Sequence, residues 1–555
     1  MDWNNFVTKT RPYTHQAKAY EKCYGKEYFA LFMEQGTGKS KTYIDIASNL
    51  FKEGKINAVM LIAPNGVHAQ WANEQLPIHS PVPYKAMIWN KSSSRIYKEM
   101  MEDFIVYPLE NNALKWLCIN VEAFSSNGHM KTFIEYLINN KVALCVDEST
   151  RIKNPKANRT VNIMYNLKKI KRGGRSKKKV LAVEERALYR TIMTGTMVTN
   201  SPYDLWSMIE SIKHDFFGMN YYSFKARYGM EIKDSIEDAS GNVRTYHRQL
   251  RNSEIESILR YHKEGKHNEA ISYIMGVTES TVDYVIKHPD NRIPYKHLDE
   301  LKQKINDIAY IVRKEDCLDL PPKVYEQLYV EMSPDQKRIY KELQKEFFSE
   351  YLNKEVTVQN KLSLLVRLQQ VTGGFFPYNE NQKGKVQLIG SKNPKVEVLL
   401  RDLEEYSWSS PVIIWARFVP ELLLLNRELK KAYPDKVIEL YYGGVYDEKR
   451  VTIKKDFAVG KVDILIANKT AGTGLNLQRS NIHYFFSNSY SLEDRVQQED
   501  RSHRIGQSSN KVLYKDIIIQ DTVDEKVYEV LSKKKELLDY FRNSSMEEFL
   551  GGKII

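Results

Sequence analysis

A glycine-rich stretch near the N-terminus, "MEQGTGKSKT", has the residue types that bind phosphate groups. It follows an apolar run and precedes a helical pattern, so backbone amides and a helix N-terminus would present partial positive charge to an anion. Lys39 would reach the β- and γ-phosphates of ATP, and the Ser40 hydroxyl would bind Mg²⁺. The usual pattern has Gly or Ala where Met33 stands, so an ordinary strand-to-helix turn is the competing interpretation. The residues expected to bind the triphosphate are Gly36, Thr37, Gly38, Lys39 and Ser40.

A pair of acids, Asp147 and Glu148, follows the apolar run "KVALCV". Acids at the end of a buried strand are usually part of a turn or a helix cap. Together with a phosphate loop, however, they match a catalytic pair, in which Asp147 holds Mg²⁺ and Glu148 orients and polarises the attacking water. The joint occurrence favours the catalytic interpretation.

These side chains need a scaffold, and the sequence predicts one in which strands and helices alternate twice. Short β-branched runs such as "NAVMLIAP" and "RTIMTGT" fill the first third, and others such as "PVIIWA" and "DILIANK" fill the last. Such runs are typical of buried parallel strands with crossover helices. We therefore predict an α/β protein with two doubly wound parallel-sheet lobes and helical insertions. The expected parts are an N-terminal lobe (1–215), a helical extension (216–320), a helical lead-in (321–390) and a C-terminal lobe (391–555), with "LDLPPK" as the hinge between lobes.

Composition favours a polyanionic partner inside the cell. The 555 residues carry a formal net charge of +13, which suits nucleic acid. The basic segment Lys168–Lys179 predicts either a solvated loop or a contact to the DNA backbone. The four cysteines form no CxxC or Cys/His cluster, which argues against zinc or a disulfide framework. Neither a signal core nor a run of about 18 apolar residues is present in the sequence, so we expect a cytoplasmic chain without a membrane span.

Beyond the acid pair, "DESTRIKN" resembles the DExH-x-IKN signature of the Swi/Snf-like ATPases of helicase superfamily two. Further segments follow in that family's order: "RPYTHQ", "LIAPNGVHAQWANE", "TGTMVTNSPYDLWS", "LPPK" and "NKTAGTGLNL". The resemblance implies RecA-like lobes and assigns adenine recognition to Gln16. It also implies DNA contacts for Pro64, Asn65, Thr194, Gly195 and Thr196, and a place for Gly474 in the segment that links ATP to DNA.

The last signature, "QQEDRSHRIGQ", matches the family's Q-xxx-R-xx-R-IGQ pattern at Gln497, Arg501 and Arg504. Planar guanidinium groups from the second lobe would bind the γ-phosphate oxygens as negative charge spreads over them. Because Arg501 and Arg504 are three residues apart, we expect them to share a helix face; a solvated face is the alternative. Thr150, Met197 and Ala471 depart from the family's pattern, and Thr150 stands where a His often couples ATP to DNA.

An insertion beginning at Ser253, "SEIESILRYHKEGKHNEAISYIMGVTESTVDYVIKHP", predicts three short helices. The second should run from Asn268 to Met275, with Gly276 in the turn. The segment, about 250–290, resembles a helix-turn-helix of the resolvase or sigma-factor type, whose third helix would enter the major groove. The expected DNA contacts are Thr278, Ser280, Thr281 and Tyr284. A helical insertion that only packs on the lobe is the alternative.

These observations together predict a DNA-dependent ATPase that translocates on or remodels double-stranded DNA, with ATP and Mg²⁺ as cofactors. Single-stranded or forked DNA is a further candidate substrate. Two other functions stay open: a strand-separating helicase on DNA or RNA, and a helix-turn-helix regulator with a degenerate ATPase body. The compact build resembles bacterial or phage forms of the family, which would act in the cytoplasm, at the nucleoid or in a host cell.

Overall fold

The computed structural model describes residues 6–90, 94–109, 112–164, 186–237, 243–291, 294–352, 358–380, 383–469 and 475–542. The chain divides into two compact units. The first comprises Met1–Asp234, Thr245–Cys317 and Leu537–Ile555, and the second comprises Ser235–Arg244 and Leu318–Glu536. Gly474, Ala471 and the whole basic segment 168–179 lie outside the described residues.

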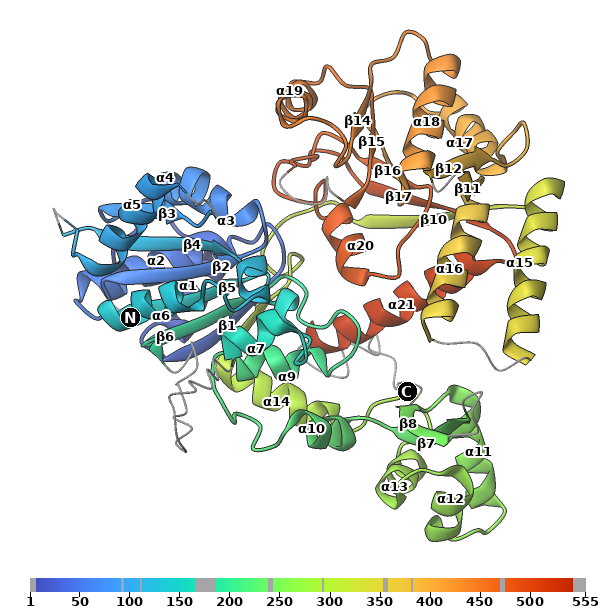
Figure 1. Ribbon diagram of the computed structural model, residues 1–555, viewed down its shortest axis with the longest axis horizontal. Coiled ribbons are helices and arrows are strands. Elements are labelled where there is room, and N and C mark those ends of the chain that lie inside the picture. The colour runs from blue at the N-terminus through green and yellow to red at the C-terminus, as the bar shows by residue number, and fades with distance from the viewer. Residues whose placement is uncertain are drawn as a thin grey trace. The chain divides into compact units, whose positions relative to one another are not determined.

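The described residues of the first unit form a seven-stranded sheet in the order β3-β4-β2-β5-β6-β1-β9. Every neighbouring pair in it is parallel. Its strands are β1 (Tyr28–Met33), β2 (Ala58–Ala63), β3 (Tyr84–Ile88), β4 (Leu114–Asn120), β5 (Val142–Asp147), β6 (Tyr189–Met193) and β9 (Ala309–Val312). Helices between successive strands return the chain to the same edge, as parallel pairing requires (Figure 1).

Both faces of this sheet are buried, which explains why its strands are continuous apolar runs rather than alternating ones. On one face, Phe29, Leu31 and Met33 of β1 pack in a cluster with residues of α1 (Thr14–Cys23) and α2 (Lys39–Lys52). The alternate residues of β1, Ala30 and Phe32, are buried as well. The other helices of the sheet's crossovers include α3 (Val67–Gln70), α4 (Leu76–His79), α5 (Arg95–Val106), α6 (Met130–Asn139) and α7 (Asn158–Met164).

A second parallel sheet, six-stranded among the described residues, has the order β10-β17-β16-β13-β15-β14. Its strands are β10 (Lys323–Val330), β13 (Val412–Trp415), β14 (Ile438–Tyr441), β15 (Ile464–Ala467), β16 (Ile482–Phe485) and β17 (Val512–Ile519). Alternate residues of β13 belong to different cores. Val412 and Ile414 pack with α17 (Pro394–Glu404) and α18 (Val419–Ala432), and Ile413 and Trp415 pack with α19 (Asp447–Ala458). The predicted fold, with two doubly wound parallel sheets, is confirmed.

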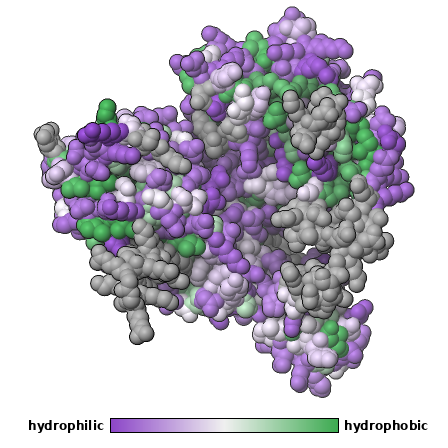
Figure 2. All heavy atoms as spheres, viewed as in Figure 1, coloured by the Kyte–Doolittle hydropathy of each residue, from purple (hydrophilic) through white to green (hydrophobic). Residues whose placement is uncertain are grey.

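Several elements were not expected from the sequence. Strands β3, β9 and β10 lie at sheet edges and are only partly buried, so their sequence pattern is weak. Strands β11 (Phe375–Glu380) and β12 (Lys383–Leu388) form a hairpin that follows α15 (Pro334–Leu352) and α16 (Val358–Thr372). No helix among the described residues has the length and apolar character needed to cross a membrane. Figure 2 shows a mainly hydrophilic face with hydrophobic side chains in small separate groups.

The insertion folds into three helices beside a hairpin, within the segment that follows α10 (Tyr221–Tyr228) and precedes α14 (Leu298–Ile308). The hairpin strands are β7 (Glu231–Glu237) and β8 (Val243–Gln249), and the helices are α11 (Asn252–Lys263), α12 (Asn268–Met275) and α13 (Glu279–Lys287) (Figure 1). Gly276 ends α12 in the left-handed region, with φ of 63°. The shared core contains Ile258, Ile271 and Val282. The predicted bounds of the second helix and its stop at Gly276 are therefore confirmed.

Candidate functional site

Three strand ends bring the predicted chemistry together in the first unit. Strand β6 lies between β5 and β1, with Asp147 opposite Met193 and Met193 opposite Leu31. Because the strands are parallel, their carboxyl ends meet at one edge, where ligands bind in such sheets. The glycine loop after β1, the acids at the end of β5 and the Thr194–Thr196 segment after β6 therefore converge.

The glycine loop can form only with glycine at its last turn. Gly38 has a φ of 91° and precedes the first residue of α2. A Cβ atom there would lie 2.1 Å from Nε2 of Gln16, so any side chain would clash. Nε2 of Gln16 donates a hydrogen bond to the Thr37 carbonyl at 3.1 Å, and Oε1 accepts one from the Tyr13 amide at 3.1 Å. The fold thus places Gln16 against the loop.

Two charged side chains are buried at this edge. Lys39 is 8% exposed, and its Nζ donates to the Met33 carbonyl at 2.9 Å. Asp147 is 7% exposed; its Oδ2 accepts from the Trp71 indole at 2.8 Å and its Oδ1 from the Glu148 amide at 3.0 Å. Burial raises the pKa of Asp147, while the Lys39 ammonium and the Trp71 hydrogen bond oppose that shift. A cation beside Asp147 would offset the hydration that the carboxylate has lost.

Glu148 is held in a strained conformation next to this pair. Its φ of 49° lies in the left-handed region, which a non-glycine residue adopts at a cost. The Thr194 hydroxyl donates to Oε2 of Glu148 at 3.3 Å. The same hydroxyl accepts from the Thr196 amide at 3.1 Å. The strain is maintained by neighbouring structure, as is common where a side chain must point in one functional direction.

The Thr194–Thr196 segment lies against the phosphate loop rather than on an open surface. Thr194 and Thr196 are buried, and a Cβ on Gly195 would lie 3.0 Å from the Gln35 amide and 3.5 Å from Nζ of Lys39. These three residues, expected to contact DNA, therefore lie next to the phosphate loop. Of the other expected DNA contacts, Pro64 is buried and Asn65 is exposed, both directly after β2.

A brace connects this segment with the stretch that follows the acids. Nζ of Lys153 donates to the Thr199 hydroxyl, which in turn donates to Oδ2 of Asp204 at 2.8 Å. Asp204, at the start of α9 (Asp204–Glu210), also accepts from the amides of Thr199 and Asn200 at 3.0 and 2.9 Å. The two departures from the family's pattern in these segments, Thr150 and Met197, are both buried and remove no member of the brace.

In the second unit, the predicted arginines follow α20 (Leu492–Glu499) rather than lying on it. The expectation that Arg501 and Arg504 share a helix face is therefore wrong, because the helix ends at Glu499 and the chain turns. The Arg501 carbonyl accepts from the Leu477 amide at 3.0 Å, and Nη1 of Arg504 donates to Oδ1 of Asn476 at 2.6 Å. Burial lowers the pKa of Arg504, with Asp500 opposing. Gln497 lies on α20 itself.

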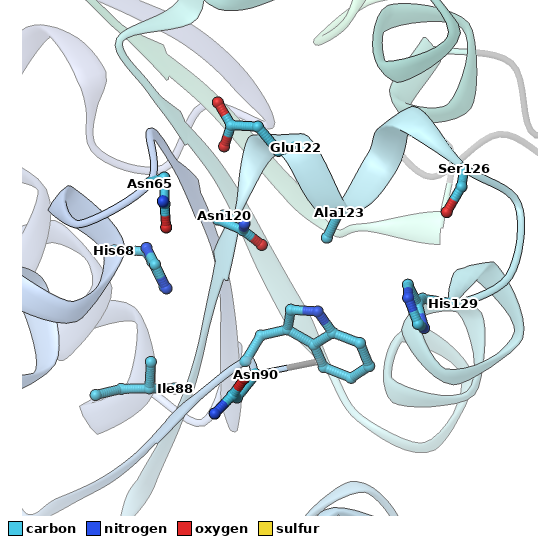
Figure 3. A pocket seen from close by; sticks show the side chains of 10 residues that line it. Asn65, His68, Ile88, Asn90, Asn120, Glu122, Ala123, Ser126 and His129 are labelled. Atoms are coloured by element: carbon cyan, nitrogen blue, oxygen red, sulfur yellow. The ribbon is translucent and has the colours of Figure 1, made fainter. Parts of the chain in front are cut away.

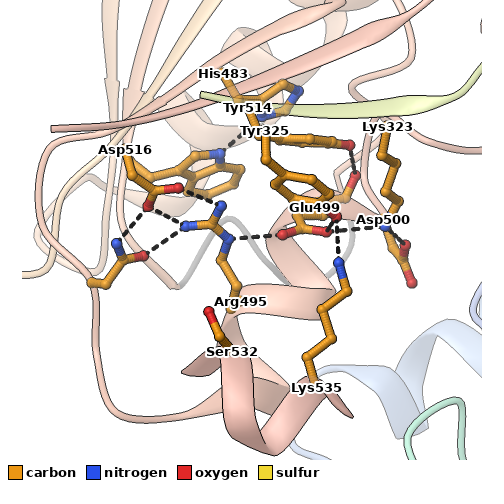
Figure 4. A network of polar contacts seen from close by, with 12 residues as sticks. Lys323, Tyr325, His483, Arg495, Glu499, Asp500, Tyr514, Asp516, Ser532 and Lys535 are labelled. Carbon is orange, nitrogen blue, oxygen red and sulfur yellow. Dashed lines mark hydrogen bonds and ion pairs between the residues drawn. The ribbon is translucent and has the colours of Figure 1, made fainter. Parts of the chain in front are cut away.

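A buried ionic network anchors this turn (Figure 4). Nη1 and Nη2 of Arg495 donate to Asp516 at 2.5 and 2.9 Å, and Nε donates to Glu499 at 2.8 Å. Glu499 also accepts from Nζ of Lys323 at 3.0 Å and from the Tyr325 hydroxyl at 2.8 Å. Burial by itself would raise the pKa of Glu499, but Lys323 and Arg495 outweigh it and hold that pKa far below its usual range.

The same network reaches the segment predicted as the hinge. Lys323 is the lysine of "LDLPPK", and it contacts Asp500 at 3.2 Å as well as Glu499. Nε2 of His503, which lies between the two arginines in sequence, is 2.9 Å from the Pro321 carbonyl. Sequence reasoning missed Trp71, Arg495 and Glu499 as supporting residues.

The insertion's expected DNA contacts divide into exposed and buried side chains. Thr278 and Ser280 are exposed at the start of α13. Thr281, in contrast, is 1% exposed; its hydroxyl lies 2.9 Å from that of Thr278 and 3.2 Å from Nζ of Lys296. The Tyr284 ring stacks on His288 at a centroid distance of 4.2 Å and is partly buried. Burial therefore assigns Thr281 to the packing of the helix start rather than to base contacts.

The geometry brings a glycine loop, a buried lysine and two acids to the carboxyl edge of one parallel sheet. Comparison with protein families agrees: the SNF2-related domain matches residues 29–373, and the helicase conserved C-terminal domain matches residues 394–506. The chain belongs to the SNF2-related family, which confirms the resemblance found in the sequence.

Similar proteins include an uncharacterized ATP-dependent helicase, MG018, of Mycoplasma genitalium, 21% identical over 99% of this chain and 44% of that protein. Another is the putative ATP-dependent helicase/translocase YwqA of Bacillus subtilis, 28% identical over 44% of this chain and 27% of that protein. The chain thus spans less than half the length of either relative. A solved structure, the Sulfolobus solfataricus SWI2/SNF2 ATPase core in complex with dsDNA, aligns over 98% of this chain and 97% of its own at 19% identity, with a TM-score of 0.37.

The ionic network predicts a stability effect confined to the second unit. Asp516→Asn would leave the buried Arg495 guanidinium short of a countercharge, and we expect it to lower the free energy of unfolding by about 3–5 kcal/mol. Asp463→Asn is the matched control, because Asp463 and its partner Lys436 are partly exposed and their pair should contribute less than about 1 kcal/mol. Hydrogen exchange of β16 and β17 measures both; equal effects would contradict a stabilising network.

Proposed function

We propose that this chain is a DNA-dependent ATPase that translocates on, or remodels, double-stranded DNA. The observation that carries the proposal is the convergence of Lys39, the acid pair Asp147–Glu148 and Thr194, which follow three adjoining strands. The net charge of +13 and the names of the relatives, ATP-dependent helicases and a helicase/translocase, support a nucleic-acid substrate. We keep the cytoplasm as the expected location.

In the proposed mechanism, the first unit binds ATP through its glycine loop. The amides of Gly36, Thr37 and Gly38 and the Lys39 ammonium would bind phosphate oxygens. At this point Lys39 would exchange the Met33 carbonyl for a phosphate, a stronger acceptor for a cation. Gln16, already bonded to the loop, would bind the adenine edge.

Mg²⁺ fits the oxygen donors at this edge. The Ser40 hydroxyl and the Asp147 carboxylate are hard ligands, and each Asp147 oxygen accepts one hydrogen bond and so retains a lone pair. When bound, the ion would neutralise charge that develops on the phosphates. Glu148 would accept a proton from the attacking water. Because Glu148 accepts a hydrogen bond from Thr194, the position of its carboxylate would affect the segment after β6.

The second unit would supply positive charge to the same triphosphate. We propose that Arg501 and Arg504 bind the γ-phosphate oxygens in the transition state, with Gln497 and Gly474 in supporting roles. The network that fixes Glu499 at the end of α20 supports this, because guanidinium groups stabilise a transition state only if their base is rigid. Cycles of ATP binding and hydrolysis would make the two units bind the DNA backbone alternately. Contacts to the backbone do not depend on the base sequence.

The catalytic assignments predict loss of ATP turnover in two variants. Lys39→Ala removes the phosphate-binding ammonium, and Glu148→Gln keeps the size of the side chain but removes the base. We expect each to lower the ATP hydrolysis rate by a factor of about 10²–10⁴, the range typical of a positioned acid–base group. Lys52→Ala, at the exposed end of α2, is the control and should hydrolyse ATP normally. Phosphate release measures all three, and full activity of Glu148→Gln would remove that residue from the mechanism.

The choice of substrate is tested by the nucleic acid that stimulates turnover. We expect duplex DNA to stimulate ATP hydrolysis more than single-stranded DNA or RNA, and we expect the protein to displace the third strand of a triplex without unwinding a fork. Efficient fork unwinding would instead favour the strand-separating helicase. Complete lack of stimulation by any nucleic acid, with intact DNA binding, would favour the regulator.

The three-helix insertion can be removed at a natural junction. Gly229 pairs with Tyr295 in an antiparallel bridge, and the Met230 amide donates to the Pro294 carbonyl at 3.1 Å, so the two ends of the insertion meet. Replacing residues 231–293 with a short Gly-Ser linker should weaken DNA binding and leave ATP turnover without DNA unchanged. Electrophoretic mobility shifts and phosphate release measure the two effects. Unchanged DNA affinity would assign the insertion a packing role.

A further inference from the structure

A pocket of about 480 Å³ opens in the half of the first sheet that does not carry the phosphate site. It lies at the carboxyl ends of β2, β3 and β4, which are neighbours in the order β3-β4-β2. Asn65 follows β2, Trp89 and Asn90 follow β3, and Asn120 ends β4. The remaining walls come from the 3₁₀ helix Val121–Ser125 and the turn before α6 (Figure 3). Its volume lies within the range of small-molecule sites.

The lining chemistry suits a planar, uncharged group that forms hydrogen bonds. Three carboxamides, Asn65, Asn90 and Asn120, each offer a donor and an acceptor, and Trp89 offers an aromatic surface. None of the described lining residues is Lys or Arg, and the exposed Glu122 adds a carboxylate, so the pocket lacks the cations that a phosphate needs. Carboxamides pair with the edges of nucleobases, and aromatic side chains stack on their faces.

His68 adds an imidazole to the pocket wall. It is 7% exposed, it lines the pocket, and its ring has hydrogen-bonding partners in the backbone of Pro64 and of Trp89. Figure 3 shows His68 beside Asn65 and across the pocket from His129. Burial lowers the pKa of His68, so its ring is neutral near pH 7 and offers one donor and one acceptor.

The indole of Trp89 is fixed by its neighbours. The Trp89 amide donates to the Cys118 carbonyl at 2.8 Å, which continues the β3–β4 ladder. Its ring makes T-shaped contacts with Phe133 at 4.8 Å and His129 at 5.1 Å between centroids. A ring held in this way loses little conformational entropy when a base stacks on it.

We propose that this pocket binds a single unpaired nucleobase, with Trp89 as the stacking surface and Asn120 and His68 as hydrogen-bonding partners. The assignment of the base to a DNA strand rests on the proposed function. It is also supported by Asn65, which lines the pocket and is itself expected to contact DNA. Removing a base from a duplex stack costs free energy, least where the base is already unpaired. The pocket therefore favours DNA with a bulged base over fully paired DNA.

The test compares two duplexes that differ only by one extrahelical 2-aminopurine. We expect the full-length protein to bind the bulged duplex about tenfold more tightly, as one stacked base allows, and to change the fluorescence of the 2-aminopurine on binding. Trp89→Leu and the milder Asn120→Ala should remove that preference and leave the affinity for the paired duplex nearly unchanged. Tyr107→Leu, an exposed aromatic residue at the end of α5, is the matched control and should keep the preference. Thermal melting verifies that each variant is folded.

Free adenosine separates the two sources of a base. Competition by adenosine against the bulged duplex, lost in Trp89→Leu, would identify a nucleoside site, whereas competition by the bulged strand alone would identify a DNA base site; both support the pocket. Normal binding and ATPase stimulation by paired DNA without any preference for the bulge would overturn the pocket and leave the proposed function intact. Preference that persists in both Trp89→Leu and Asn120→Ala would also overturn it. If no DNA binds, the proposed function fails, and calorimetric titration with adenosine then decides the pocket by itself.

Discussion

A lysine ammonium and an aspartate carboxylate buried at one edge of a parallel sheet impose the main constraint on this structure. Lys39 and Asp147 have both lost most of their hydration, so each needs polar partners that the fold must supply. The Met33 carbonyl, the Trp71 indole and the Glu148 amide provide them. One arrangement thus includes the phosphate loop, a glutamate whose backbone is in the left-handed region and a tryptophan from a segment distant in sequence. It holds the charged groups where ATP would bind.

The second unit also contains buried charged side chains, and in it these charges neutralise one another. Arg495 lies between Asp516 and Glu499, and Lys323 completes the set, so each buried ion has a countercharge within 3.0 Å. Desolvation offsets much of the attraction in the intact network, but removing one partner is costly because it leaves an uncompensated buried charge. Its position at the end of α20 and at the start of β10 explains how the fold fixes the turn that carries Arg501 and Arg504.

The parallel sheet of the first unit provides two separate places for ligands at one edge. One half, β5-β6-β1, carries the charged residues of the phosphate site, and the other half, β3-β4-β2, carries the carboxamides and the tryptophan of the pocket. Both sit at carboxyl strand ends, where loops are free to vary without disturbing the buried strands. The roles proposed for these two places are binding of the triphosphate and binding of an uncharged base.

The sequence by itself determined the elements whose physics is local. Continuous apolar runs gave the central strands, Gly276 gave the end of α12, and "GTGKS" and "DES" gave the phosphate loop and the acids, because spacing and residue type decide these features. Edge strands such as β3 and β10 escaped notice, since a half-exposed strand need not be apolar. Only the tertiary structure decided which strand ends adjoin, that Thr281 is buried, that α20 stops before Arg501, and that Trp71 and Glu499 hold the charged residues. Those outcomes depend on contacts between residues tens to hundreds of positions apart, and no local pattern encodes the desolvation that such contacts produce.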